Sequence, residues 1–256
     1  MIAEIKGKVS RDNTNLTELR EDELTGNLFG CLRYISFNKG MKKILKNAIR
    51  PIELKSLIDS IDVCYWNDNI FLWDKIEENG KITELDVRME FDSVVIGIEV
   101  KYRSGLSSED NKDAKGISAE NSINQLSREA RILRKIAPDK CKILLLLADE
   151  SVCAETIKGI KIVEGVQLGY ISWQEVLIQL KKLTDLDIFE RLIIADLIEL
   201  LEKKGFERFN DFCISTACID EKKYWDFKLV ENKETFTFKY NKMVEVKYYE
   251  FGGKHF

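Results

Sequence analysis

Two acidic residues and a lysine occupy one short segment of the chain with the chemistry of a metal-assisted hydrolytic site. Glu99 and Lys101 lie two positions apart, and Asp86 precedes them. Carboxylate oxygens are the ligands that a hard divalent ion such as Mg²⁺ prefers. A lysine on the same face would lie close to any phosphate or water that the ion holds. The residue types therefore predict a metal site with an amine beside it, provided that the fold brings these side chains together.

The segment around these residues is predicted to form two antiparallel strands joined by a tight turn. Residues 84–91 alternate polar and apolar side chains with a period of two, and residues 94–102 are rich in β-branched side chains. Asp92-Ser93 has the length of a hairpin turn. The pairs that this turn dictates are Phe91 with Val94, Val87 with Ile98, Asp86 with Glu99, Leu85 with Val100 and Glu84 with Lys101. Opposed carboxylates repel each other unless a cation lies between them, so this register favours a bound ion.

The same register assigns the side chains to two faces. The predicted apolar face consists of Leu85, Val87, Met89, Phe91, Val94, Ile96, Ile98, Val100 and Tyr102. Asp86, Glu99 and Lys101 share the opposite face, beyond Gly97. A simpler interpretation needs no metal: Glu84 and Lys101 form a cross-strand ion pair, and Asp86 is an ordinary solvent-facing residue.

Glu84-Leu85-Asp86 followed by Glu99-Val100-Lys101 resembles the motif of the PD-(D/E)XK nuclease superfamily. Many members have proline where this chain has Leu85. The resemblance covers residues 19–182 and implies an α/β fold, in which helices flank a mixed central β-sheet in the order α-β-β-β-α-β. It also implies a Mg²⁺- or Mn²⁺-dependent endonuclease. Asp86, Glu99 and the Val100 carbonyl would hold the ion, and Lys101 would position the attacking water.

Two further residues have counterparts in many members of this superfamily. Glu23 lies in a predicted helix over residues 19–36 and would complete the metal shell. Alternatively, it only stabilises the positive end of that helix. Gln125 lies in a predicted helix over residues 118–136 and would orient the water or a phosphate. Its alternative role is that of a polar residue flanking an amphipathic helix.

Candidate nucleic-acid contacts are Arg128, on the same predicted helix as Gln125, Arg103, directly after the second strand, and Tyr34, beside the apolar stripe of the first helix. For Arg128 the alternative is again the polar side of an amphipathic helix. DNA is the expected substrate in preference to RNA.

Composition excludes several other hydrolytic mechanisms. The one histidine, His255, is the penultimate residue, so a Ser-His-Asp or Cys-His mechanism has no imidazole in the predicted core. Six cysteines without a CxxC pair are typical of reduced thiols in a cytoplasmic protein. No apolar run is long enough to span a bilayer. The net charge of −4 disfavours general binding to nucleic acid and leaves room for a local basic groove or a partner that delivers the substrate.

We expect a nuclease-like core over residues 1–183 and a C-terminal extension over residues 184–256. The extension would comprise an amphipathic helix at 187–204 and a lysine-rich, aromatic segment with strand-like stretches at 235–238 and 244–249. A homodimer would suit double-strand cleavage. The expected function is that of a defence- or restriction-type endonuclease. The alternative is a catalytically inactive module of the same fold that binds nucleic acid or serves as an assembly subunit of a multi-subunit system.

Overall fold

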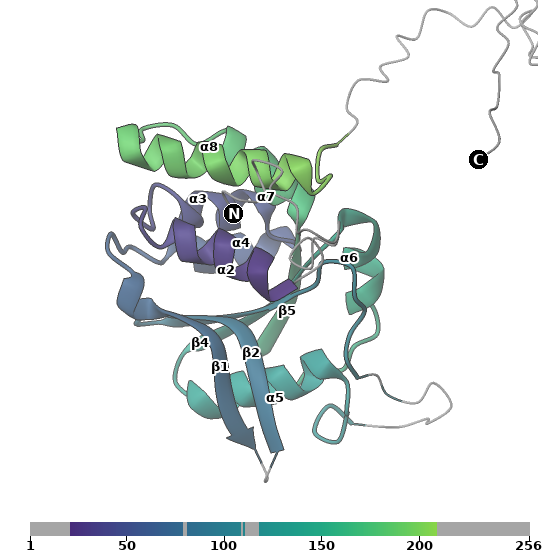
Figure 1. Ribbon diagram of the computed structural model, residues 1–256. Helices are drawn as coiled ribbons and strands as arrows, with labels where there is room; N and C mark the ends of the chain where they lie inside the picture. Colours follow the sequence, from purple (N-terminus) through teal and green to yellow (C-terminus); the bar gives the residue numbers. More distant parts are fainter. Residues whose placement is uncertain (1–20, 79–80, 109, 111–117, 209–256) are drawn as a thin grey trace, which may run out of the picture. The chain divides into compact units, whose positions relative to one another are not determined.

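The computed structural model describes residues 21–78, 81–108, 110 and 118–208 (Figure 1). Five strands form one sheet in the order β1-β2-β3-β4-β5. The strands are β1 (Ile70–Glu78), β2 (Lys81–Glu90), β3 (Val94–Val100), β4 (Cys141–Ala148) and β5 (Val166–Ser172). The first three strands pair antiparallel, and β3, β4 and β5 pair parallel. The sheet is therefore mixed, which confirms the predicted α/β class.

Helices cover both faces of this sheet. The described α-helices are α2 (Glu21–Leu32), α3 (Met41–Ala48), α4 (Lys55–Asp59), α5 (Gln125–Ile136), α6 (Glu150–Ile157), α7 (Trp173–Lys181) and α8 (Ile188–Lys203), with 3-10 turns η1 (Ile52–Leu54) and η2 (Asn67–Asn69). The larger core cluster packs α2, α3, α7 and α8 on one face, and the smaller cluster packs α5 on the other (Figure 1). Every residue of β3 is buried, as expected for a central strand covered on both faces. None of the described helices combines the length and apolar character needed to cross a bilayer.

The predicted hairpin register is confirmed from the turn as far as Val87 and Ile98, where the β2–β3 ladder ends. The further predicted pairs, Asp86 with Glu99, Leu85 with Val100 and Glu84 with Lys101, are not part of the ladder. Val87 pairs with Ile98, and the Phe91 N–H donates to the Val94 carbonyl at 2.8 Å. The strand expected at 166–172 has the predicted bounds. These strands are predictable because their apolar content and their turn residues agree with each other.

One part of the predicted apolar face is wrong. Val87 and Met89 pack into the larger cluster, on the face covered by α2, whereas Leu85 packs into the smaller cluster with α5. Strict alternation would put Leu85 and Val87 on the same face, so the strand changes its orientation at Asp86. The β1–β2 ladder is interrupted at the same level: Leu72 pairs with Val87 and Asp74 with Leu85, and no pair is formed between them. Beyond this point the hairpin runs alongside α5 (Figure 1).

Helix α5 begins later than predicted. The expected start near Ser118 is replaced by Gln125, because the Asn124 side chain caps the helix by accepting from the Leu126 N–H at 3.0 Å. Ile123 precedes the helix and is exposed. The later start places Gln125 in the first turn of α5.

The predicted domain boundary after Leu183 precedes helix α8. Helix α8 contributes Leu197, Leu200 and Leu201 to the larger core cluster, and the compact unit of which it is part ends at Arg208. Its amphipathic pattern therefore reports packing on the core. The strand-like stretches predicted at 235–238 and 244–249 lie outside the described residues.

Candidate metal centre

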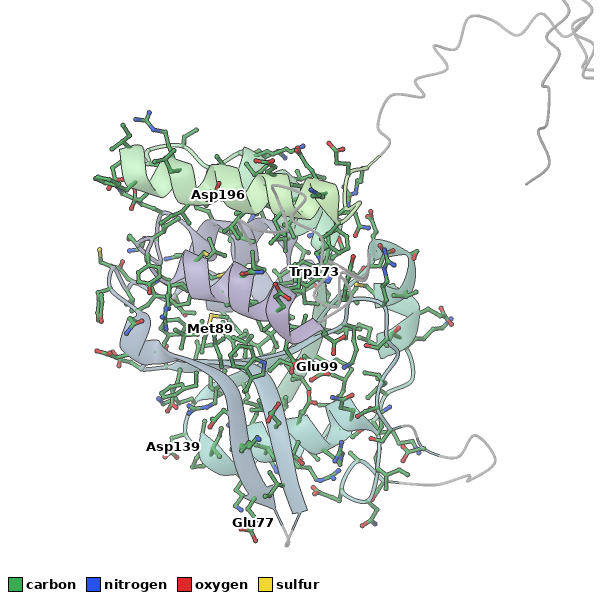
Figure 2. All side chains as sticks on the ribbon, viewed as in Figure 1. Glu77, Met89, Glu99, Asp139, Trp173 and Asp196 are labelled. Atoms are coloured by element: carbon green, nitrogen blue, oxygen red, sulfur yellow. The ribbon has the colours of Figure 1, made fainter. Side chains whose placement is uncertain are left out.

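Three carboxylates meet at the C-terminal end of β3. One oxygen each from Glu21, Asp86 and Glu99 lies within 4.8 Å of the other two. Glu21 belongs to the first turn of α2, Asp86 to β2 and Glu99 to β3. Figure 2 shows Glu99 between α2 and α5. The structure thus brings together the two carboxylates that the sequence paired and adds a third one from a distant segment.

Asp86 is held by the backbone of the neighbouring strand. Its Oδ2 accepts a hydrogen bond from the Val100 N–H at 2.8 Å. Burial, together with the nearby Glu99 and Glu21 carboxylates, raises the pKa of Asp86 to about 7, although the Val100 hydrogen bond and Lys101 oppose this shift. The side chain is therefore destabilised as an anion until another positive charge reaches it.

The acidic residue that α2 contributes is Glu21, and our assignment of Glu23 to the cluster is corrected. Glu21 Oε2 accepts from the Tyr102 N–H at 3.0 Å and from the Ser104 hydroxyl at 2.6 Å, and its Oε1 accepts from Lys101 Nζ at 3.1 Å. Residues two apart on a helix point in nearly opposite directions, so Glu23 cannot share this position. The Tyr102 N–H and the Ser104 hydroxyl, which follow β3, thus hold Glu21 rather than Glu23 at the cluster.

Lys101 is fixed at both its backbone and its amine. Its N–H donates to the Leu147 carbonyl at 2.7 Å, and its carbonyl accepts from Trp173 Nε1 at 2.9 Å. Its Nζ lies 2.5 Å from Glu99 Oε1 in addition to its contact with Glu21. Burial lowers the pKa of Lys101, but Glu99 and Glu21 raise it by more, and the net direction is upward. Lys101 therefore remains a cation and is unsuited to act as a free base.

Gln125 connects Glu99 to the loop that follows β3. Its Nε2 donates to Glu99 Oε1 at 2.7 Å, while its Oε1 accepts from the N–H and the hydroxyl of Ser107, each at 2.9 Å. The first turn of α5 thus fixes the orientation of Glu99 directly. Gln125 contacts the Glu99 carboxylate, whereas the predicted role was to orient the water or a phosphate.

A second buried acid, Glu129, lies behind Glu99 and was missed by the sequence analysis. Glu129 is fully buried beside Glu99 and Gln125, and both of its oxygens and Glu99 Oε2 are shielded from solvent. Burial and the neighbouring Glu99 raise the pKa of Glu129 well above its ordinary value, which favours its neutral form. The available signal was its position one turn after Gln125, on the same face of an amphipathic helix.

Close packing between β3 and α5 sets the position of these groups. A Cβ atom on Gly97 would lie 2.8 Å from Leu133 Cδ1. Gly97 precedes Glu99 by two residues on the same face, and Leu133 lies two turns after Gln125. The absence of a side chain at Gly97 therefore lets α5 approach the strand closely enough for Gln125 to reach Glu99.

The predicted nucleic-acid contacts are distributed unevenly around the cluster. Arg128 lies on α5 near Gln125, and its buried Nε has no hydrogen-bond partner among the described residues. Arg103 is exposed directly after β3, with its guanidinium carbon 5.2 Å from the Tyr102 ring centroid. Tyr34 follows the opposite end of α2 from Glu21, about 20 Å along the helix axis, and stacks with Arg33. Tyr34 is thus not brought to the cluster.

The metal-free interpretation predicted an ion pair between Glu84 and Lys101, and that pair is absent. Lys75 Nζ lies 3.2 Å from Glu84 Oε2 instead, across the β1–β2 hairpin. The Val100 carbonyl was predicted as a ligand, and the interaction that the structure shows for Val100 is the donation from its N–H to Asp86.

Comparisons with models of known protein families, with curated proteins and with solved structures give no significant match to this chain. The geometry of the site alone therefore supports its interpretation. Three carboxylates face one ammonium group in a largely buried space, which leaves an excess of negative charge that a cation can neutralise.

Proposed function

We propose that the protein is a Mg²⁺- or Mn²⁺-dependent nuclease that hydrolyses phosphodiester bonds. The observation that carries the proposal is the uncompensated charge at the end of β3, where Glu21, Asp86 and Glu99 face Lys101. Sites of this composition bind hard divalent ions through oxygen. The motif resemblance to the PD-(D/E)XK superfamily adds the expectation that the substrate is nucleic acid, with DNA preferred over RNA.

The residues fit a divalent ion on chemical grounds. Asp86 and Glu99 would hold it, with Glu21 available as a third carboxylate once Lys101 moves from it. Glu99 Oε2 is buried, and the neighbouring Glu129 carboxyl can donate to Glu99 only while it is protonated. The bound ion would supply Lewis acidity toward the scissile phosphate and would lower the pKa of a water molecule.

The chain's own residues account for the positioning. Lys101 presents a permanent positive charge, and its backbone is anchored to β4 and to Trp173, so its amine can stabilise charge on a phosphate oxygen in the transition state. Gln125 holds Glu99 in one orientation. Arg128, whose Nε is unpartnered, and exposed Arg103 are the basic groups from which a phosphate backbone would obtain its further contacts.

The direct experiment incubates the purified protein with supercoiled plasmid, single-stranded DNA and RNA, each with Mn²⁺, with Mg²⁺ and with EDTA. Cleavage of at least one substrate should require the divalent ion. Replacement of Asp86, Glu99 or Lys101 by alanine should abolish it while the variants remain folded by circular dichroism. A matched control is Glu84→Ala, because Glu84 lies on the same strand and pairs with exposed Lys75. Ion-independent cleavage, or full activity of the Asp86 variant, would contradict the proposal.

A second candidate function, a non-catalytic module of the same fold, is favoured by one observation. Both oxygens of Glu21 are satisfied by groups of the chain itself, namely Lys101, Tyr102 and Ser104. A purely structural network would have this property. It would bind no divalent ion, so the absence of any Mg²⁺- or Mn²⁺-dependent rise in thermal stability would favour it.

A further inference from the structure

Strand β1 contains a residue in a costly backbone conformation at the level of the metal centre. Trp73 has φ = 53°, one of two positive values at non-glycine residues in the described part of the chain. The conformation is strongly disfavoured for a bulky side chain and persists only where the surrounding structure imposes it. It coincides with the gap in the β1–β2 ladder, between the pairs Leu72–Val87 and Asp74–Leu85. Asp86 is the β2 residue at that gap.

The tip of the Trp73 ring reaches the helix that carries Glu21. A Cβ atom on Gly26 of α2 would lie 3.1 Å from Trp73 Cη2, so the ring packs closely over the backbone of α2 at this glycine. Gly26 follows Glu21 by five residues, about 7 Å along the helix axis. Trp73 thus spans from the strand position facing Asp86 to the helix of Glu21, the two flanking sources of carboxylates.

This indole remains accessible to solvent although it is packed at one end. Trp73 is 37% exposed, whereas Trp66 and Trp173 are 1% and 0% exposed. Among the described residues it takes part in no aromatic or cation–π contact. Phe71, two positions earlier on β1, is similarly exposed, but the Arg88 guanidinium lies 3.9 Å from its ring centroid. Trp73 therefore presents, at the strand position opposite Asp86, an aromatic ring with a surface available for stacking.

We propose that Trp73 is a stacking platform for an unpaired nucleobase next to the scissile phosphate, so that the preferred substrate is a single-stranded or locally unpaired strand. The inference rests on the proposed nuclease function and deepens it. A base stacks on an aromatic face with little dependence on its identity, and paired bases in an intact duplex do not offer that face. The strained backbone turns the indole toward α2, where it can meet a nucleotide whose phosphate lies at the acidic cluster.

The test compares cleavage of a short single-stranded oligodeoxynucleotide with cleavage of a hairpin duplex of the same sequence, for the wild type and for Trp73→Ala, Trp73→Leu and Trp73→Phe. The alanine and leucine variants should raise the KM for the single strand by about ten-fold or more with little change in kcat. The phenylalanine variant should recover most of the affinity, and cleavage of the duplex should stay within about two-fold. Phe189→Ala is the matched control, because Phe189 is an exposed aromatic residue in the first turn of α8.

Binding is measured separately by quenching of tryptophan fluorescence in the Glu99→Gln background with Mg²⁺. Trp66 and Trp173 are buried, so quenching by the single strand that is present with Trp73 and lost in Trp73→Phe reports stacking on this ring. If Trp73→Ala impaired cleavage of the single strand and of the duplex equally, or if Trp73→Leu were as active as Trp73→Phe, the stacking role would be refuted. Trp73 would then have only a structural role. Stacking without any cleavage would refute the nuclease and retain the platform. Ion-dependent cleavage without Trp73-dependent quenching would refute the stacking role and retain the nuclease.

Discussion

Strand β2 contributes to two charged networks that differ in their charge balance. The balanced network consists of Asp74, Arg88, Glu90 and Lys140: Arg88 pairs with Asp74 at 2.6 Å and with Glu90, and Lys140 pairs with Glu90 at 2.8 Å. The acidic cluster consists of Glu21, Asp86 and Glu99, and the ammonium group that pairs with it in the described part of the chain is that of Lys101.

The pKa shifts in the two networks run in opposite directions. The hydrogen bond from Lys140 lowers the pKa of Glu90, whereas burial and the Glu99 carboxylate raise the pKa of Asp86 to about 7. The balanced network is complete without any partner. The acidic cluster carries unfavourable electrostatic energy that a bound cation would lower, which is the difference we expect between a stabilising network and the proposed metal site.

The largest effect should come from isosteric removal of one charge in each network. Glu99→Gln should lower the rate of DNA cleavage by about 10³-fold, because a carboxylate that would hold the ion is lost. Glu90→Gln should change the rate by less than about three-fold. Initial rates with Mg²⁺ check both variants, and comparable losses would show that catalysis does not depend on the charge excess at the cluster.

Divalent ions should stabilise the wild type. This stabilisation should depend on the acidic cluster and should not depend on the balanced network. At a Mg²⁺ or Mn²⁺ concentration about 100 times the Kd, binding adds about 2.7 kcal/mol to the free energy of unfolding. For a chain of this size that raises Tm by roughly 5 to 10 °C. Differential scanning fluorimetry should show the shift in Glu90→Gln and lose it in Asp86→Asn; an unchanged shift in Asp86→Asn would place the ion elsewhere.

Without divalent ions, the raised pKa of Asp86 should make the free energy of unfolding depend on pH. Its folded-state pKa of about 7 exceeds its ordinary value, so between about pH 4 and pH 7 the folded state binds more protons than the unfolded state. The free energy of unfolding should therefore fall as the pH rises through this window. Urea titrations in EDTA should show that decline in the wild type and a flatter profile in Asp86→Asn.

The smallest effect concerns the balanced network itself. Lys140→Met removes one ion pair that is partly exposed, and it should lower the free energy of unfolding by about 0.2 to 1 kcal/mol at neutral pH. Because the folded-state pKa of Glu90 is lowered, this contribution is present above the ordinary pKa of Glu90 and is lost as the pH falls through the folded-state value. Divalent ions should leave the difference between variant and wild type unchanged.

The sequence supports the hairpin better than it supports the third carboxylate. The turn at 92–93 and the alternation on β2 and β3 fix the pairing of Val87 with Ile98, so the proximity of Asp86 to Glu99 follows from local rules. Three consecutive acids open α2, and the choice among them depends on Tyr102 and Ser104, donors about 80 positions away. No local pattern contains that information.

The change in strand orientation at Asp86 could not be predicted from the sequence either. Polar and apolar residues alternate through Leu85 and Val87 without interruption, although the two side chains enter different clusters. The cause lies in the partner strand, where Trp73 adopts a left-handed backbone conformation that aromatic residues rarely take. Hydrophobic periodicity reports burial, and in this case both faces of the sheet are buried.

The contact between Gly97 and Leu133 makes the spacing of two structural layers a determinant of chemistry. A single methyl group added at this position would act as a spacer, tilting α5 outward and drawing the Gln125 amide off the oxygen that it steadies. Such a variant would keep every acidic group and the lysine, yet its reacting groups would be misaligned by a fraction of an ångström. The alignment of the site therefore depends on the packing of α5 against the sheet as much as on the charged residues at the end of β3.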